Sequence, residues 1–373
     1  MLLISILITL IYLLLIGSFI WGFDKVSAFS LEDIPANTTF TIVIPFRNEA
    51  ENLPVLLNSI KNLNYPKHLF EVIFVDDDSN DDSVSIIKSF IKNTSNFKII
   101  LNERKTNSPK KDAITLAIQN AKNHWIVTTD ADCQLPKFWL DSFDEYIQKN
   151  KVSCIAAPVT YSNTNSFLNP FQTLDILSLQ GATIGGFGLK KPFMCNGANF
   201  AYKKSIFLDV NGFSGNTNIA SGDDIFLLEK VAKKYPKQLH YLKCDKAIIK
   251  TNAQHTIKDL IAQRIRWAAK TTAYNNFYGK LTGLIVLLKN ALLIIGLTLV
   301  VINTFSPKTL FYIAFIKFNI DFYLLYKTAS FFNQKNILKS YVFGFLLYPF
   351  FSVFVASISM FSGYKWKGRK FKK

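Results

Sequence analysis

Apolar residues are spread unevenly along this chain and divide it into three regions. Residues 2–23 form an almost uncharged apolar stretch that is long enough to cross a bilayer. The region 281–362 is again mostly apolar and is broken by short polar loops. Between these regions, short β-branched runs alternate with amphipathic stretches, as in a folded soluble domain. The pattern predicts a membrane protein with a soluble middle.

The first half of the soluble middle alternates strands and helices. We expect strands at 40–45, 70–75, 97–101 and 125–127, and between them helices at 49–62, 81–92 and 110–122. Units of this kind form right-handed crossovers and a parallel sheet. The Gly-x-Gly-x-x-Gly loop of dinucleotide-binding folds does not occur, which argues against a Rossmann dinucleotide site. The predicted fold class is α/β with a mainly parallel sheet.

The second half is less regular. Residues 152–157 favour a strand, 166–180 have helical spacing, and 193–200 return to extended structure. The glycines at 181, 185, 186 and 188 predict a mobile loop. A further helix is expected to begin at Ser221 or Asp223, and residues 256–278 form an amphipathic stretch typical of helices in the membrane interface.

Two carboxylates follow the predicted strand at 125–127. Side chains two positions apart on a strand share a face, so Asp130 and Asp132 point the same way. The carboxyl end of a parallel strand is where open α/β sheets bind ligands, and hard oxygen ligands suit Mg²⁺ or Mn²⁺ held together with phosphates. The alternative is a solvated turn, in which Asp is common.

Charge and cysteine content narrow the class of protein. The net charge is +17, but no nucleic-acid-binding motif accompanies it and many basic residues flank apolar segments, so we exclude nucleic acid as a partner. Basic residues beside membrane segments belong on the cytoplasmic side, and phosphate-bearing substrates would also be attracted. The four cysteines are scattered without a Cys-x-x-Cys pair, as in a reduced, cytoplasm-facing protein.

The membrane segments leave the topology open. Residues 2–23 lack a basic start and a nearby cleavage site, which favours a retained anchor over a signal peptide. Six basic residues in the last ten favour a cytoplasmic tail, and such a tail requires an even number of crossings after the soluble domain. The segment 309–327 carries Lys317 and Asp321, which predicts burial between helices or a path that does not span.

Seven short motifs, in this order, resemble those of membrane-embedded family 2 glycosyltransferases such as ceramide glucosyltransferase, hyaluronan synthase and cellulose synthase. The motifs are VIPFRNE (43–49), VDDDS (75–79), KKDA (110–113), DAD (130–132), NGAN (196–199), GDD (222–224) and QRIRW (263–267). The resemblance implies a GT-A-type nucleotide-sugar-binding domain, an N-terminal transmembrane helix and a C-terminal membrane helix bundle. The expected domains are a membrane anchor at 1–23, the catalytic domain at 24–255, an amphipathic interface helix at 256–280, and membrane helices with a basic tail at 281–373.

The resemblance assigns the donor-binding residues. They are Pro45, Arg47, Glu49, Asp76, Asp77, Lys110, Lys111, Asp130 and Gln263. It also implies that Asp132 and Asp130 hold Mg²⁺ or Mn²⁺, and that the metal and Arg266 stabilise the diphosphate leaving group. Helix capping and turn formation are the alternative roles for Glu49 and Asp77.

The resemblance also assigns the residues on the acceptor side. Asp224 is implied to be the general base, with Asp223 where many relatives carry Glu, and one base with direct attack implies inversion at the anomeric carbon. Asn196, Asn199 and Trp267 are implied to contact the acceptor. A helix N-cap is the alternative for the two aspartates, and an interfacial anchor is the alternative for Trp267.

The function expected is metal-dependent, inverting sugar transfer from a nucleotide sugar, usually a UDP-sugar in the family, to a lipid or lipid-linked glycan acceptor. The site would face the cytoplasm at a bacterial cytoplasmic membrane. A processive polysaccharide synthase stays open, although at most four spans make a small bundle for threading a polymer. The alternative of another class is a non-catalytic transporter or nucleotide-sugar-binding protein. The presence of Asp132, Asp224 and Arg266 argues against it. A nucleotidyltransferase would have no use for the QRIRW helix.

Overall fold

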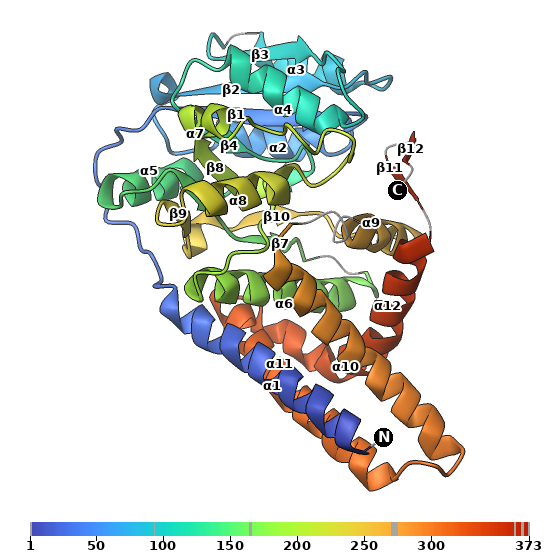
Figure 1. The fold of residues 1–373 in the computed structure, drawn as a ribbon. Helices are drawn as coiled ribbons and strands as arrows, with labels where there is room; N and C mark the ends of the chain where they lie inside the picture. Colours follow the sequence, from blue (N-terminus) through green and yellow to red (C-terminus); the bar gives the residue numbers. More distant parts are fainter. Residues whose placement is uncertain are drawn as a thin grey trace. The chain divides into compact units, whose positions relative to one another are not determined.

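The computed structural model describes residues 2–92, 94–163, 166–269, 275–361, 363–366 and 369–371 (Figure 1). The chain forms two compact units. The helical unit comprises Met1–Val26, Asn163–Phe193 and Ala253–Lys373, and the sheet unit comprises Ser27–Ser162 and Met194–Asn252. Parts of the predicted interface helix (270–274) and of the basic tail (367–368 and 372–373) lie outside the described residues. The functional domain boundaries stay a prediction.

A seven-stranded sheet, counted over the described residues, forms the centre of the sheet unit in the order β3-β2-β1-β4-β8-β6-β9 (Figure 1). Its strands are β1 Phe40–Phe46, β2 Phe70–Asp76, β3 Phe97–Leu101, β4 Trp125–Thr128, β6 Cys154–Ala156, β8 Phe200–Lys203 and β9 Leu239–Tyr241. β8 runs antiparallel to β4 and β6, and the other pairings are parallel. The predicted α/β fold with a mainly parallel sheet is confirmed.

A small three-stranded sheet holds the segment after β4. It contains β5 Cys133–Gln134, β10 Ile249–Thr251 and β7 Val159–Tyr161, in that order. β10 pairs antiparallel with β5, where Thr251 lies opposite Cys133, and parallel with β7. The short segment between Thr128 and Cys133 is therefore anchored at both ends by strand pairing.

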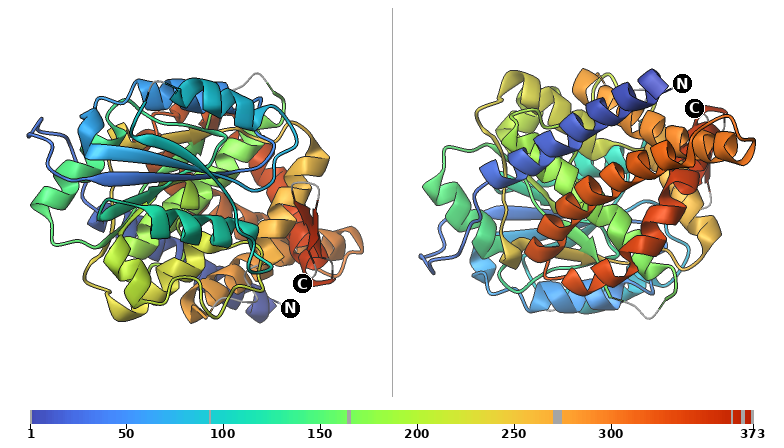
Figure 2. Two further views of the ribbon diagram at one scale, coloured as in Figure 1. Left: turned by 90° about the horizontal axis from the view of Figure 1, so that it is seen from above. Right: turned by 90° about the horizontal axis from the view of Figure 1, so that it is seen from below.

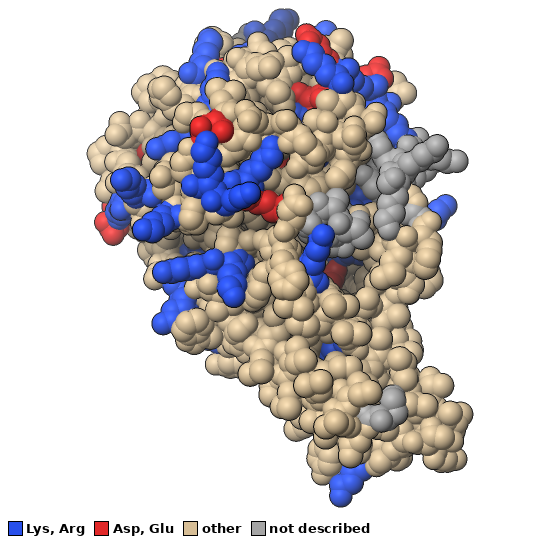
Figure 3. Space-filling model, in the orientation of Figure 1, with Lys and Arg blue, Asp and Glu red and all other residues tan. Residues whose placement is uncertain are grey.

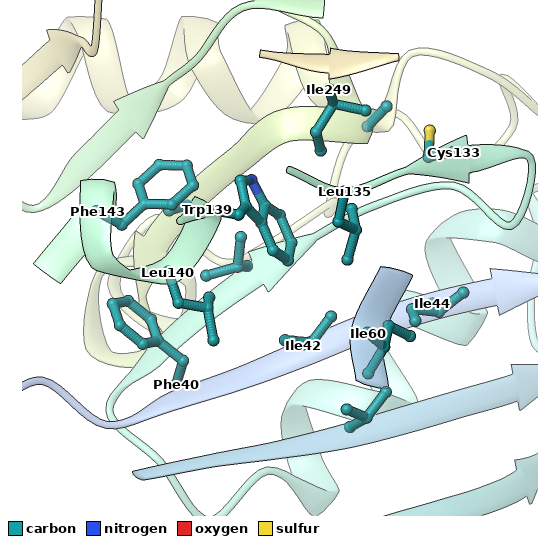
Figure 4. Packing of buried hydrophobic residues seen from close by; sticks show 14 of the residues in the cluster. Phe40, Ile42, Ile44, Ile60, Cys133, Leu135, Trp139, Leu140, Phe143 and Ile249 are labelled. Carbon is teal, nitrogen blue, oxygen red and sulfur yellow. The ribbon is translucent and has the colours of Figure 1, made fainter. Parts of the chain in front are cut away.

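Helices with one apolar face complete the core of the sheet unit. They are α2 Leu53–Lys61, α3 Ser83–Ile91, α4 Pro109–Asn120, α5 Trp139–Lys149, α7 Lys204–Asp209 and α8 Asp223–Lys234, with short 3₁₀ turns η1 Lys67–Leu69, η2 Gly197–Asn199 and η3 Asp245–Ala247. Ile60 of α2 and Trp139 of α5 pack with Phe40 and Ile42 of β1 in one buried cluster (Figure 4). α2 begins four residues later than predicted because Asn48 adopts a left-handed backbone (φ 50°), and 49–52 form a turn.

The helical unit contains α1 Leu2–Lys25, α6 Asn169–Gly188, α9 Ile257–Ala269, α10 Phe277–Val301, α11 Pro307–Phe331, the 3₁₀ helix η5 Lys335–Ser340 and α12 Tyr341–Phe361. The strands β11 Tyr364–Trp366 and β12 Arg369–Phe371 form a hairpin after α12. By length and composition, α1, α10, α11 and the helix Lys335–Phe361 could cross a membrane, as expected of an integral membrane protein. α1 and α11 pack side by side (Figure 2), and the helices at the lower right of Figure 3 show little charge on the face drawn there. The expected N-terminal apolar helix and the long apolar helices of the C-terminal region are confirmed.

The glycines at 181, 185, 186 and 188 belong to α6, so the predicted mobile loop is wrong. Gly181, Gly185 and Gly188 recur at helical spacing. A Cβ atom at Gly185 would lie 2.5 Å from the carbonyl oxygen of Phe19, and one at Gly188 would lie 1.8 Å from that of Gly22. The glycines therefore allow α6 to approach the backbone of α1, and what resembled a flexible loop is a packing surface.

The charges of α11 lie between helices, the first of the two alternatives for this segment. Lys317 and Asp321 form an ion pair one turn apart, and the hydroxyl of Tyr12 donates to Asp321 Oδ1 over 2.6 Å. Lys289 of α10 donates to Thr9 Oγ1 over 2.8 Å. Charged groups in an apolar environment need such partners, so these contacts join α1, α10 and α11.

Candidate active site

The carboxyl ends of four neighbouring strands bring polar residues to one edge of the large sheet. The parallel register places Phe46 opposite Asp76 and Asp76 opposite Leu101, so the residues that follow them meet there. β4 continues this edge, and its successor Thr129 donates from its backbone N–H to Val43 O over 3.1 Å. Open α/β sheets bind their ligands at this edge.

Two arginines organise the turn after β2. Arg104 Nε and Asn102 Nδ2 both donate to Asp77 Oδ1, over 2.6 and 2.9 Å, and Arg47 Nη1 donates to Asp77 O over 2.6 Å. Hydrogen bonds from both arginines hold the pKa of Asp78 below its ordinary value. The Nε atom of Arg47 is buried and, among the described residues, has no hydrogen-bond partner. A buried donor of this kind is suited to complete its bonding with a ligand.

The other donor-side residues predicted at this edge make local contacts. Asp76 Oδ1 accepts from Ser79 N over 3.0 Å, and Glu49 Oε2 accepts from Asn52 Nδ2 over 2.7 Å. Pro45 lies within β1, opposite Val75 of β2. Turn formation is thus observed for Asp76 and Glu49, and their contact with a donor stays a prediction.

Lys110 joins three motifs that lie far apart in the sequence. Its ammonium Nζ lies 2.6 Å from Asp130 Oδ1 and 3.3 Å from Asp223 Oδ2. Burial by itself would lower the pKa of Lys110, but the negative charges of Asp130 and Asp223 raise it above its ordinary value. The start of α4, the end of β4 and the start of α8 therefore meet at one charged cluster.

Asp224 is held by backbone N–H groups at the start of α8. Its Oδ2 accepts from Gly197 N over 3.1 Å, and its Oδ1 accepts from Ile225 N over 2.8 Å. The carboxylate is half-buried and lies in the first turn of the helix, where the helix dipole favours negative charge. Asn196 caps the short 3₁₀ helix η2 by accepting from Ala198 N. The NGAN and GDD motifs are therefore in direct contact.

Lys111 and Asn199 have structural roles. Lys111 is buried and donates to the carbonyl oxygens of Asn216 and Ile219 over 2.7 and 2.9 Å. Asn199 is fully buried, donates to the carbonyls of Pro158 and Ala247, and accepts from Trp139 Nε1. Both side chains thus hold neighbouring backbone or core, and their contacts with donor and acceptor stay a prediction.

Asp130 and Asp132 offer oxygen ligands. Over the described ranges, no group of three or more His, Cys, Asp and Glu residues is placed to hold a metal ion. Asp132 is partly exposed, and the Cys133 thiol lies 3.8 Å from its Oδ1. Two carboxylates fit Mg²⁺ or Mn²⁺ when phosphate and water supply the other ligands, because these cations prefer oxygen and bind with substrate phosphates.

The remaining predicted residues lie on α9, in the helical unit. They are Gln263, Arg266 and Trp267, and all three are partly exposed. Arg264, between them in sequence, is buried and lies over the Trp267 ring, with Cζ 4.2 Å from the ring centroid. Arg264 was not among the predicted site residues, and neither were Asn102 and Arg104. The last two follow β3, and their place beyond a strand end is the signal that could have found them.

Comparison with known proteins finds similarity to glycosyltransferases. Residues 41–210 match the model for Glycosyl transferase family 2. The chain is 26% identical over 230 residues to poly-β-1,6-N-acetyl-D-glucosamine synthase of Staphylococcus epidermidis, covering 59% of this chain and 52% of that protein. It is 24% identical over 187 residues to glycosyltransferase AglE of Haloferax volcanii, covering 50% and 58%. The chain thus spans about half the length of these two curated relatives.

A shorter match and one solved structure add to this. Over 102 residues the chain is 36% identical to undecaprenyl-phosphate 4-deoxy-4-formamido-L-arabinose transferase of Pseudomonas savastanoi pv. phaseolicola, covering 26% of this chain and 28% of that protein. The mannosyltransferase PcManGT of Pyrobaculum calidifontis, solved with GDP-Man and Mn²⁺, superposes with a TM-score of 0.56 at 16% identity, covering 96% and 99% of the two chains. This second likeness supports the fold alone.

Proposed function

We propose that the chain is a glycosyl transferase of family 2, whose model matches residues 41–210, and that it transfers a sugar from a nucleotide-sugar donor to a lipid or lipid-linked acceptor. The observation that carries the proposal is the cluster of Lys110, Asp130, Asp223 and Asp224 at the carboxyl ends of the sheet. It combines a cation for phosphate with a carboxylate that can take a proton. These are the two groups that sugar transfer from a diphosphate requires.

The donor side of the proposal rests on the strand ends. Asp77, Arg47 and the neighbouring Arg104 form a polar edge that suits the base and ribose of a nucleotide, with UDP the expected carrier. Lys110 lies where it can attract the diphosphate. A divalent cation, Mg²⁺ or Mn²⁺, held by Asp132 and Asp130 would offset the negative charge that develops on the leaving group.

The acceptor side rests on Asp224. Its carboxylate takes the proton of the acceptor hydroxyl as that oxygen forms a bond to the anomeric carbon. The bond from that carbon to the diphosphate breaks, and the nucleoside diphosphate leaves with the electron pair. One base and one direct displacement invert the configuration of the anomeric carbon. Asp223 supports this site through its ion pair with Lys110.

The residues of α9 complete the proposal through the family resemblance. Gln263 and Arg266 are assigned to the leaving group, and Trp267 to a flat surface against the acceptor. Asn196, beside Gly197 and hence near Asp224, is assigned to the acceptor as well. The long apolar helices support a reaction at a membrane, and because nucleotide sugars are made in the cytoplasm, we assign the site to the cytoplasmic face.

Transfer of a single sugar is favoured over processive synthesis because four candidate spans make a small bundle for threading a polymer. The relatives include both types by name, an undecaprenyl-phosphate transferase and a poly-N-acetylglucosamine synthase. Mass spectrometry of the product separates the two, since a ladder of sizes from one acceptor would indicate processive synthesis.

Incubation of the detergent-purified protein with a panel of nucleotide sugars and a lipid extract tests the proposal. We expect release of nucleoside diphosphate from one donor, together with a glycosylated lipid detected by mass spectrometry. Donor binding without release of diphosphate or product across the panel would instead indicate a transporter or a binding protein.

A further inference from the structure

Helix α6 holds the chain around α9 at two points through buried polar contacts. Gln172, fully buried, donates from Nε2 to Gln254 O over 2.9 Å and accepts from Gln254 N through Oε1 over 2.8 Å. Three residues further along α6, Asp175 Oδ2 accepts from Arg264 Nε over 2.6 Å. The first contact fixes the segment before α9, and the second fixes α9 itself.

The Asp175–Arg264 pair is almost fully removed from solvent. The two side chains are 5% and 6% exposed. Removing two charges from water is costly, and a buried ion pair can often be replaced by apolar side chains without loss of stability. α9 already buries Leu260 and Ile265, so apolar contacts suffice to dock it. Docking alone therefore does not account for the pair.

The ion pair fixes the orientation of the Arg264 side chain. The guanidinium group of Arg264 is planar, and its bond to Asp175 fixes the orientation of that plane. The same group lies over the ring of Trp267 and donates a hydrogen bond to Gln263 Oε1. Arg264 thus links a residue of α6 to two residues of the QRIRW motif.

We propose that Asp175 is a positioning residue for sugar transfer, which acts through Arg264 to orient Gln263 and Trp267. The inference rests on the proposed function, in which Gln263 contacts the leaving group and Trp267 the acceptor. Asp175 itself touches neither substrate.

A pair of variants separates positioning from stability. Asp175→Leu removes the carboxylate that Arg264 contacts while the charge of Arg264 stays buried, so we expect a lower melting temperature and little turnover. Adding Arg264→Met removes that charge, and the double variant should recover the melting temperature. Turnover of the double variant should stay about 10-fold to 100-fold low, because Gln263 and Trp267 are no longer held. Calorimetry should show donor affinity within a few-fold of the original protein.

A second buried ion pair provides the matched control. Lys317 and Asp321 lie in the same unit, on α11, and are also largely buried. The double variant Lys317→Met/Asp321→Leu removes one buried pair of the same kind, and we expect normal turnover from it. Asp175→Glu keeps the charge and should restore part of the activity.

The inference would be overturned if Asp175→Leu/Arg264→Met transferred sugar at the original rate, since the pair would then serve only to neutralise its own charges. Equal losses of turnover in this variant and in Lys317→Met/Asp321→Leu would overturn it as well. Failure of the proposed function has a different signature. In that case the unaltered protein transfers sugar from none of the donors, and no reaction remains for Asp175 to support.

Discussion

At the scale of single residues, the position of Lys110 controls the electrostatics of the candidate site. Asp130 and Asp223 both contact its ammonium group, and Asp224 follows directly after Asp223. Carboxylates this close together would repel one another without a cation between them. The ammonium group of Lys110 therefore offsets the negative charge that these acids bring to one place.

Replacement of Asp224 by asparagine tests the base directly. Asp224→Asn keeps the size of the side chain and removes its ability to accept a full proton, so turnover should fall by roughly 10²-fold or more. Donor binding, measured by calorimetry, should stay within a few-fold because the strand-end residues are unchanged. A variant with near-normal turnover would mean that another group takes the proton.

Asp132 tests the metal. Asp132→Asn removes one of the two carboxylates assigned to the cation, so donor binding should lose its dependence on Mg²⁺ or Mn²⁺. Calorimetry of donor binding with each cation and with a chelator measures this. Equal turnover of the original protein with cation and with chelator would contradict the metal assignment. Lys110 would then be the positive charge that offsets the diphosphate.

At the scale of elements, α6 depends on the glycines that face α1. Gly181 also approaches another helix, since a Cβ atom there would lie 2.5 Å from the Thr328 hydroxyl of α11. These close approaches maximise the contact between backbones, as small residues do between membrane helices. Because α6 also carries Asp175, its placement against α1 determines where α9 is held.

A single added methyl group should disturb this packing. We expect Gly185→Ala to destabilise the protein by roughly 1–3 kcal/mol, the usual cost of overpacking, because the new Cβ meets the backbone of Phe19. The measurement is thermal unfolding in detergent. Gly17→Ala on α1 is the matched control, because a Cβ atom there meets nothing within 4 Å. That control should be neutral or slightly stabilising through its better helix propensity. Equal melting temperatures for the two variants would contradict the close approach.

At the scale of the whole molecule, α12 bears on the membrane topology. The rings of Phe351 of α12 and Phe171 of α6 pack edge to face with their centroids 5.1 Å apart. A Cβ atom at Gly344 of α12 would lie 2.9 Å from Leu174 of α6. Further along, α12 contacts α9, which Asp175 ties to α6 (Figure 1). α12 therefore packs along α6 and reaches α9, which favours a path that does not cross the bilayer.

The tail should accordingly lie on the cytoplasmic side. Two crossings, by α10 and α11, return the chain to the side from which α10 began. The sequence left open a path for 309–327 that does not cross the membrane. Because the charges of α11 are paired between helices, we instead expect α12 to be the helix that does not cross. In a variant without native cysteines, Lys372→Cys should react with an impermeant reagent only after the membrane is opened. Thr304→Cys, between α10 and α11, should react in intact cells. Labelling at position 372 in intact cells would show that α12 crosses.

Much of the fold follows from local sequence alone. Alternating β-branched and amphipathic runs determined the parallel strands and their helices, because backbone periodicity selects which side chains can be buried together. Long apolar segments predicted the membrane helices for the same reason. The topology also predicts the place of three site residues, because the carboxyl ends of parallel strands meet at one edge of the sheet. These residues are Arg47, Asp77 and Asp130.

Only the tertiary structure shows which of two nearby residues in a motif contacts the candidate site. Lys110 reaches the carboxylates while Lys111 holds a loop, because consecutive residues on a helix point in different directions. Asn196 and Asn199 differ in a similar way, because Asn196 precedes Gly197, which donates to Asp224, whereas Asn199 lies in the core. The glycines of α6 and the partners Asn102, Arg104 and Asp175 were also hidden, since each depends on what a distant segment places opposite it. Local sequence determines which way a side chain can point, and the packing of distant segments determines what it meets.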